Sequence, residues 1–324
     1  MPDLVTAADV LAIGETMVMV TPRQGGRLDA ESAFMLRPGG AESNVAALLA
    51  MLGHRTAWAG AVGNDPLGEI VVGSLRAHGV NVDLVRRDDQ RPTAVYFKDP
   101  TPSGTAVYYY RRGSAASAMS AADVVRWAAM LARLTHISGV TAAISPQCLD
   151  LTRHVVLERP LRPALVSFDV NHRPALWSGD APAVLLEIAQ HSDVVFVGRD
   201  EAAALWGTSD AESVRELLDR PAYLIVKDAA VEAVSFTPSG VHRVPSPQVD
   251  VVDAVGAGDA FAAGWLSGFL DDRDEVTRLR LGHYAASRVL TSPEDLAALP
   301  TADEIAGMLS EGADNRVADR RSRH

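Results

Sequence analysis

The chain is poor in several features that define other classes of protein. Its 324 residues contain a single cysteine, Cys148, which excludes a disulfide framework and a cysteine-based zinc site. No apolar run approaches the roughly 20 residues that cross a bilayer, and the N-terminus lacks the basic stretch of a signal peptide. The net charge of −11 is opposite to the basic footprint of a nucleic-acid-binding protein. We therefore expect a cytoplasmic protein without a membrane or nucleic-acid partner, and an inert thiol at Cys148.

Short apolar runs alternate with amphipathic helical stretches after about residue 120. This alternation is typical of βαβ units and predicts an α/β fold: a doubly wound, mostly parallel sheet flanked by helices. A hairpin at 231–244 is expected on the edge of the sheet. Sheets of this kind bind ligands at the carboxyl ends of their strands. The expected parallel strands lie at 134–138, 165–169, 194–197 and 223–226.

Two further β-rich segments are too short to form a domain of their own. We expect them to form a small sheet that lies over the ligand cleft as a lid. The charged, apolar-poor end of the chain is expected to be flexible. The predicted organisation is therefore an α/β core of residues 1–15, 38–90 and 113–312, a β-lid of residues 16–37 and 91–112, and a flexible tail of residues 313–324.

The most informative segment is DAVGAGDAFAAG, residues 253–264. The small residues Gly256, Ala257 and Gly258 leave backbone amides bare at a predicted helix start, which is an anion site. Asp259 follows directly. A carboxylate beside an anion site suits phosphoryl transfer, where a proton is removed close to developing negative charge. The alternative is an aspartate that only complements the helix dipole.

This segment resembles the C-terminal signature of the ribokinase (PfkB) carbohydrate kinases, D-T-x-G-A-G-D, with Ala254 in place of threonine. GGAESNVA at 39–46 and GNDPLG at 63–68 are similar to the family's other signature. The resemblance covers nearly the whole chain. It implies a ribokinase-like fold with a β-lid, ATP with Mg²⁺, Asp259 as catalytic base, and an anion hole built from the amides of Gly256, Ala257 and Gly258.

A narrower resemblance points to the branch of this family that phosphorylates 2-keto-3-deoxygluconate. It rests on YYYRRGSAAS at 108–117 and FDVNHRPALW at 168–177. An acidic sugar presents a carboxylate, which Arg111 and a tyrosine hydroxyl can bind; a solvated strand end is the alternative for Arg111. Asn44 can contact the sugar or cap a helix that begins near Val45. The implied substrate contacts are Gly40, Asn44, Tyr96, Tyr109, Arg111, Arg173, Asp259 and Asp295.

The nucleotide side departs from the family pattern. Ala229 and Glu232 replace the glycines of K-x-G-x-x-G, so a β-carbon penalises positive φ and a negative charge is expected near the phosphates. Where an N-x-x-E pattern is usual, the chain reads Gly198-Arg199-Asp200-Glu201, so the glutamate is present and the asparagine is not. The phosphoryl donor therefore stays open. The resemblance implies nucleotide contacts from Asn171, Arg173, Glu201, Lys227, Gly256, Gly258 and His283; no metal ligands are predicted.

Three functions compete at this point. The first is phosphorylation of 2-keto-3-deoxygluconate to its 6-phosphate, and the second is the same chemistry on another small sugar. The third is a sugar-binding regulatory protein with a degenerate nucleotide site. Loss of Arg111 discriminates the first two, because it should damage turnover of an acidic sugar most. The open edges of the lid predict a homodimer that forms through it.

Overall fold

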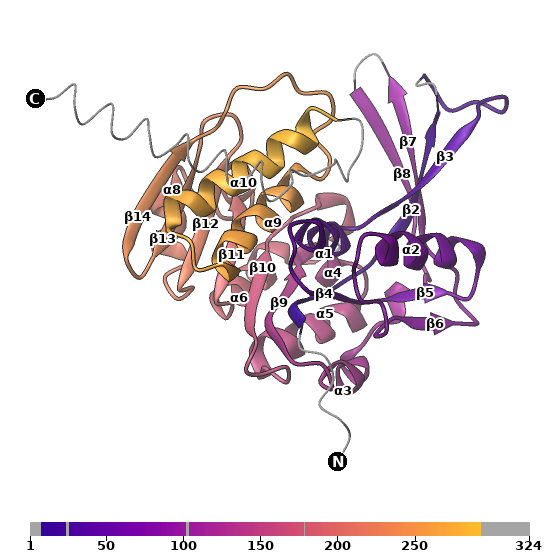
Figure 1. Ribbon diagram of the computed structural model, residues 1–324, viewed down its shortest axis with the longest axis horizontal. Helices are drawn as coiled ribbons and strands as arrows, with labels where there is room; N and C mark the ends of the chain where they lie inside the picture. Colours follow the sequence, from indigo (N-terminus) through magenta and orange to yellow (C-terminus); the bar gives the residue numbers. More distant parts are fainter. Residues whose placement is uncertain (1–7, 24–25, 102–103, 178, 293–324) are drawn as a thin grey trace, which may run out of the picture.

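The centre of the molecule is an eight-stranded sheet (Figure 1). The computed structural model describes residues 8–23, 26–101, 104–177 and 179–292. Neighbouring strands are parallel except at one edge, where β12, β13 and β14 form an antiparallel meander. The predicted mostly parallel sheet is confirmed. In spatial order the strands are β14 (Gly240–Pro245), β13 (Glu232–Thr237), β12 (Tyr223–Asp228), β11 (Val194–Gly198), β10 (Leu165–Asp169), β9 (Ala132–Ser138), β1 (Ala8–Ile13) and β4 (Thr56–Ala59).

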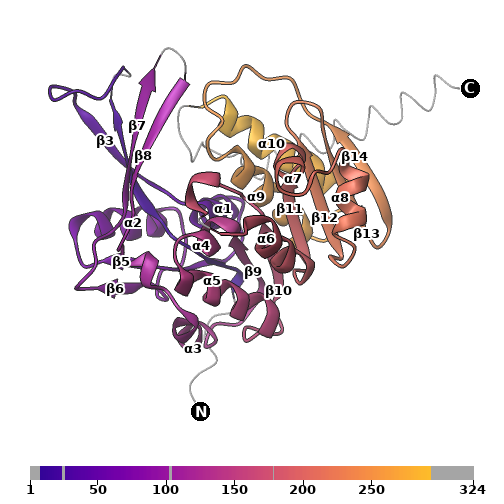
Figure 2. The same ribbon diagram turned by 180° about the vertical axis from the view of Figure 1, so that it is seen from behind.

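Helices cover both faces of this sheet, which is the reason its strands are apolar on both sides. In β11, Val194 and Phe196 pack against α9, whereas Val195 and Val197 join the opposite core. One face carries α1 (Ala41–Met51), α9 (Ala257–Leu270) and α10 (Glu275–Leu290). The other carries α4 (Gly139–Ala143), α5 (Pro146–Arg153), α6 (Ala181–Gln190), α7 (Arg199–Trp206) and α8 (Ala211–Leu217) (Figure 2).

A second sheet of four strands stands beside the core and projects beyond it (Figure 1). Its one face carries the buried side chains of Met17, Met19 and Tyr96. The other face carries Leu36 and Tyr108, which are exposed. This is the small sheet expected as a lid. Its strand order is β3 (Phe34–Gly39), β2 (Met17–Pro22), β7 (Val95–Thr101) and β8 (Gly104–Tyr110).

The remaining elements join the two sheets. Asp65 caps α2, accepting a hydrogen bond from the Gly68 amide at 2.8 Å, and Pro66 occupies the first helical position as expected. These elements are α2 (Pro66–Ala77), α3 (Val124–Trp127), the parallel pair β5 (Ala61–Gly63) and β6 (Arg86–Asp88), the 3₁₀ turns Ala116–Ala118, Ala121–Asp123 and Pro174–Leu176, and the π-helical turn His154–Glu158.

Helix α1 begins earlier than the sequence suggested. Its N-cap is Gly40, so Asn44 lies inside the helix and does not cap it. The capping alternative for Asn44 is therefore wrong. The cause is tertiary: Glu42 and Asn44 are polar but buried, because each finds a partner on another element. Asp295 and the expected tail at 313–324 lie outside the described residues.

Cys148, expected as an inert thiol, is fully buried in the core. Burial raises the pKa of its thiol to about 11. Across the ranges given above, no helix combines the length and the apolar character that a bilayer crossing requires.

Candidate active site

Asp259 lies in the first turn of α9, close to the carboxyl ends of the parallel strands. The helix starts from Gly256, whose φ of 81° is a left-handed conformation that favours glycine. Asp259 is 9% exposed. Its carboxylate accepts hydrogen bonds from Asn44 Nδ2 at 2.9 Å and from Asn171 Nδ2 at 3.4 Å. Helix α1 and the segment after β10 therefore hold this carboxylate from two sides.

The pKa of Asp259 is strongly shifted. Its pKa is raised to about 7, mainly by burial and in addition by the negative charge of Asp169. The Asn44 hydrogen bond and the positive charges of Arg173 and Lys227 act in the opposite direction. A carboxylate with a pKa near neutrality is suited to accept a proton from a hydroxyl group.

Positive charge gathers beside the glycine-rich loop 256–258. A side chain on Gly258 would place its Cβ 3.6 Å from Lys227 Nζ, so this ammonium lies next to the loop. Lys227 Nζ also pairs with Asp169 Oδ2 at 3.0 Å. The amides in the first turn of a helix have no partner within the helix. Loop, lysine and helix dipole together form a site for a negatively charged group.

The carboxylates of Asp169 and Glu201 are suited to bind a hydrated magnesium ion. Glu201 accepts hydrogen bonds from the amides of His172 and Gly198, the latter at 3.1 Å. Burial raises the pKa of Glu201, and the nearby charge of Asp169 adds to the increase. A divalent cation would relieve this repulsion, and Mg²⁺ in kinases keeps waters and phosphates as its other ligands. A cluster of three or more metal-binding side chains does not occur in the described part of the chain.

Two tyrosines of the small sheet, Tyr96 on β7 and Tyr109 on β8, lie on its inner face. Tyr96 packs over Gly39, where a β-carbon would lie 2.4 Å from the phenol oxygen. The rings of Tyr96 and Tyr109 are 5.7 Å apart between centroids. Tyr110 instead packs edge-on against Phe97 on the outer face. Alternation along β8 thus places only Tyr109 of the three adjacent tyrosines on the inner side.

Arg111 is not a solvated strand end. It forms an ion pair with Glu15, and the exposed fractions of the two side chains are 10% and 1%. Ser114 Oγ donates to Glu15 Oε1 at 2.9 Å, and the Arg111 guanidinium lies 5.9 Å from the centre of the Tyr109 ring. Burial raises the pKa of Glu15, and the charge of Arg111 opposes that increase. Glu15 therefore holds Arg111 in one orientation and offsets part of its charge.

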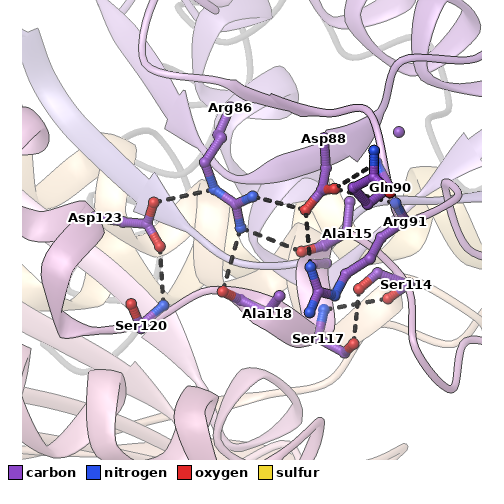
Figure 3. A network of polar contacts seen from close by, with 12 residues as sticks. Arg86, Asp88, Gln90, Arg91, Ser114, Ala115, Ser117, Ala118, Ser120 and Asp123 are labelled. Atoms are coloured by element: carbon purple, nitrogen blue, oxygen red, sulfur yellow. Dashed lines mark hydrogen bonds and ion pairs between the residues drawn. The ribbon is translucent and has the colours of Figure 1, made fainter.

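A network around Arg86 supports the segment that carries Ser114 (Figure 3). The guanidinium donates to Asp88 at 2.9 Å and to Asp123 at 3.1 Å. It also donates to the carbonyls of Ala115 at 3.4 Å and Ala118 at 3.2 Å. Strand β6 thereby holds the turn 114–118 in place, and Ser114 in this turn supports Glu15.

The segment after β12 contains both departures from the K-x-G-x-x-G pattern, Ala229 and Glu232. Ala229 has a φ of 37°, so an alanine adopts a left-handed backbone conformation that favours glycine. Glu232 pairs with Arg243, which also pairs with Glu212. The expected negative charge of Glu232 is therefore offset by a neighbouring guanidinium.

The other expected site residues differ in their surroundings. Gly40 caps α1, and a β-carbon there would lie 2.3 Å from the Glu15 carbonyl oxygen. Arg173 is exposed, and it donates to the His172 carbonyl at 3.2 Å. His283 is buried, with Nε2 3.0 Å from the carbonyl oxygen of Val244 and its ring edge-on to another ring. Glu15 and Asp169 were not among the expected site residues, although Asp169 ends an apolar strand at the expected ligand edge.

A doubly wound sheet beside a small second sheet, with a buried carboxylate of raised pKa at the glycine-rich start of a helix, is the arrangement of a small-molecule phosphotransferase. The chain belongs to the pfkB family of carbohydrate kinases, whose family model matches residues 7–302. It is 34% identical over 315 residues to the 2-dehydro-3-deoxygluconokinase of Bacillus subtilis, covering 93% of this chain and 95% of that protein.

Two solved structures are similar to the whole molecule. The 2-dehydro-3-deoxygluconokinase of Thermotoga maritima superimposes with a TM-score of 0.83 at 26% identity, covering 94% of this chain and 99% of that one. The fructokinase of Xylella fastidiosa with bound ATP gives a TM-score of 0.80 at 25% identity, with 94% and 98% covered. The predictions of a ribokinase-like fold and of a carbohydrate kinase are confirmed.

Proposed function

We propose that this kinase transfers the γ-phosphate of ATP to the 6-hydroxyl of 2-keto-3-deoxygluconate, which is also called 2-dehydro-3-deoxygluconate. The observation that carries the proposal is the buried carboxylate of Asp259, whose pKa of about 7 suits a base, next to the anion site of loop 256–258. Two of the similar proteins are 2-dehydro-3-deoxygluconokinases, which supports the choice of sugar.

The chain's own residues suffice to position the reaction. Asp259 accepts the proton of the sugar hydroxyl, whose oxygen then attacks the γ-phosphorus in line. Asn44 and Asn171 hold the carboxylate in place. The amides of Gly256, Ala257 and Gly258, with the Lys227 ammonium beside them, stabilise charge on the transferred group.

ATP with Mg²⁺ is the proposed phosphoryl donor. Asp169 and Glu201 would orient the hydrated ion, which neutralises phosphate charge when bound. Arg173 is exposed and is proposed to contact the phosphates or the sugar acid. His283 and Asp295 remain proposed contacts to the nucleotide and the sugar, respectively.

The carboxylate of the sugar acid is proposed to bind Arg111, which Glu15 holds in one orientation. Gly40, Asn44, Tyr96 and Tyr109 would complete the sugar site. Because Glu15 also offsets the charge of Arg111, a second candidate substrate is a small neutral sugar. A regulatory protein without turnover is disfavoured by the intact base and anion site.

The test is an ADP-release assay with Mg²⁺–ATP, with 2-keto-3-deoxygluconate and a set of neutral sugars as acceptors. We expect turnover that prefers the sugar acid and that falls about 10²–10⁴-fold in Asp259→Asn. Arg111→Met should raise KM for the sugar acid and leave neutral sugars little changed. Equal effects on acidic and neutral sugars would select the second candidate, and folded protein without turnover on any sugar would overturn the kinase proposal.

The proposed assembly is a homodimer through the outer face of the lid. Leu36, Val20, Phe97 and Tyr108 occupy one row across all four lid strands. Leu36 and Tyr108 are 45% and 49% exposed. An exposed apolar sheet face of this kind is typical of a protein interface. The proposed location is the cytoplasm, where ATP is supplied.

A further inference from the structure

The chain has two lysines among its 30 basic residues, and both pair with aspartates near the proposed site. They are Lys98 and Lys227. Their side chains are 6% and 19% exposed, and each ammonium lies 3.0 Å from a carboxylate oxygen, of Asp253 and Asp169 respectively. Lys227 belongs to the anion site described above. Lys98 has no place in that machinery, because it comes from the lid.

Lys98 connects two parts of the molecule that are 155 positions apart in sequence. It lies two residues after Tyr96 on β7, so both side chains point to the inner face of the lid. Asp253 begins the segment that leads into α9. Its Oδ2 accepts from Lys98 Nζ at 3.0 Å, while its Oδ1 accepts from the Val255 amide at 3.0 Å. One carboxylate therefore joins the lid to the loop that precedes Gly256.

The pair is sensitive to the position of the lid. A buried ammonium without a partner is costly, so the contact with Asp253 stabilises Lys98 in its buried position. Displacement of β7 would separate the two charges and would remove one of the two partners that hold the Asp253 carboxylate. The ion pair thus favours a lid seated on the core together with a fixed loop 253–258.

We propose that the Lys98–Asp253 ion pair is a latch that couples sugar binding under the lid to nucleotide binding at the loop. Lys98 is accordingly a positioning residue. A sugar bound beside Tyr96 favours the seated lid, which fixes the loop for the phosphates of the nucleotide. By linkage, a bound nucleotide must strengthen sugar binding by the same factor. The inference rests on the proposed assignment of loop 256–258 as the phosphate site.

The first test measures this factor directly by calorimetry. The affinity for 2-keto-3-deoxygluconate is measured with and without a non-hydrolysable ATP analogue and Mg²⁺. We expect the analogue to strengthen sugar binding about fivefold or more in the wild type, the lower end of usual coupling. In Lys98→Met the factor should fall below about twofold, with sugar affinity in the absence of nucleotide little changed.

Arg27→Met is the matched control. It removes another lid cation, one that pairs with Asp99 inside the lid at 3.3 Å and so does not reach the core. It should keep the wild-type factor. Equal factors in wild type and Lys98→Met, absence of coupling in the wild type, or an equal loss in Arg27→Met would overturn the latch.

A second measurement does not depend on turnover. An amine-reactive reagent with peptide mapping can follow Lys98 separately from Lys227 and the N-terminal amine. Lys98 should react slowly in the wild type and at least several-fold faster in Asp253→Asn, with Lys227 unchanged. Unchanged reactivity of Lys98 in Asp253→Asn would overturn the latch. A wild type without sugar phosphorylation, but with this difference in reactivity, would overturn the proposed function and leave the lid contact standing.

Discussion

Asp259 combines two requirements that oppose each other in water. A base must be ionised to accept a proton, yet burial beside Asp169 disfavours its charge. The hydrogen bonds from Asn44 and Asn171 stabilise the ionised form without supplying a full opposite charge. With the resulting pKa of about 7, Asp259 can accept and release a proton near physiological pH.

The first residue-scale prediction concerns the pH dependence of kcat/KM. Because the pKa of Asp259 is about 7 in the folded protein, activity should decrease below about pH 7 with a limiting slope of one. The positive charge of Lys227 lowers the pKa of Asp259. Lys227→Met removes this charge, so the acidic limb of the pH profile should move to higher pH. A pH profile with a limb near pH 4 in the wild type would contradict the assignment.

The second prediction concerns stability. The ordinary pKa of an aspartate is 3.8, and the folded value of Asp259 is about 7. Between these values the folded state retains a proton that the unfolded chain releases, so the contribution of this group to stability decreases as pH rises from about 4 to about 7. Asp259→Asn lacks this dependence. Its Tm relative to the wild type should therefore be higher at about pH 8 than at about pH 5, measured by calorimetry without ligands.

At the scale of the elements, the segment 114–123 contains only short 3₁₀ turns, and side-chain hydrogen bonds hold it in place. Arg86 on β6 supplies hydrogen bonds to two backbone carbonyls and to Asp123 (Figure 3). Ser114 then fixes Glu15, and Glu15 fixes Arg111. The orientation of a side chain in the lid thus depends on an arginine outside the site.

Arg86→Ala should loosen this segment. Its removal leaves Asp88 and Asp123 without a shared partner, and we expect a loss of about 1–3 kcal/mol in the free energy of unfolding. KM for the sugar acid should rise more than kcat falls, because positioning is affected and the base is not. Denaturant unfolding and steady-state kinetics measure the two effects.

Arg153→Ala is the corresponding control. Arg153 pairs with Glu187 across α5 and α6, with exposed fractions of 39% and 38%, so its loss should cost less than about 1 kcal/mol. If both variants lose the same stability and leave KM unchanged, the Arg86 network has no positioning role.

The strands could be predicted more accurately from sequence than the start of α1. Apolar runs such as 165–169 coincide with β10 because burial on both faces leaves a continuous apolar signal. The first turn of α1 contains Glu42, whose Oε1 accepts from Ser138 Oγ and Thr141 Oγ1 at 2.7 Å. A local pattern shows only a polar residue there; its partners lie almost 100 positions away.

At the scale of the whole molecule, the lid has two different faces. The inner face carries Tyr96, Tyr109 and Lys98 toward the core, and the outer face exposes apolar side chains. Phe34 and Tyr110 add to this outer surface, with 41% and 65% exposed. The lid sheet is therefore amphipathic in a way that suits a ligand on one side and a protein partner on the other.

Leu36→Asp should weaken the proposed dimer. A carboxylate on the outer face would have to lose water in the interface, which favours the monomer. Light scattering coupled to gel filtration should show a monomer for Leu36→Asp and a dimer for the wild type. Val125→Asp is the control, because Val125 is 81% exposed on α3, away from the lid. A monomeric wild type, or two dimeric variants, would contradict the lid interface.

The site could be predicted only as far as its chemistry is encoded in adjacent residues. Loop 256–258 and Asp259 are contiguous, so their pattern is visible in one segment. The partners of Arg111 and Lys98 are Glu15 and Asp253, which only the folded chain brings near them. Sequence analysis could therefore propose a base and an anion site, but not the ion pairs that orient Arg111 and Lys98.

The burial of Cys148 has a practical consequence for observing the lid. Its thiol is fully enclosed and, with a pKa of about 11, is almost entirely protonated at neutral pH. Maleimide dyes should therefore not label Cys148 in the folded protein. Two cysteines introduced at exposed positions, Arg23 on the lid side and Val241 on β14, can carry a donor and an acceptor fluorophore without removal of Cys148. Energy transfer between them would then report the angle of the lid in single molecules as each substrate arrives.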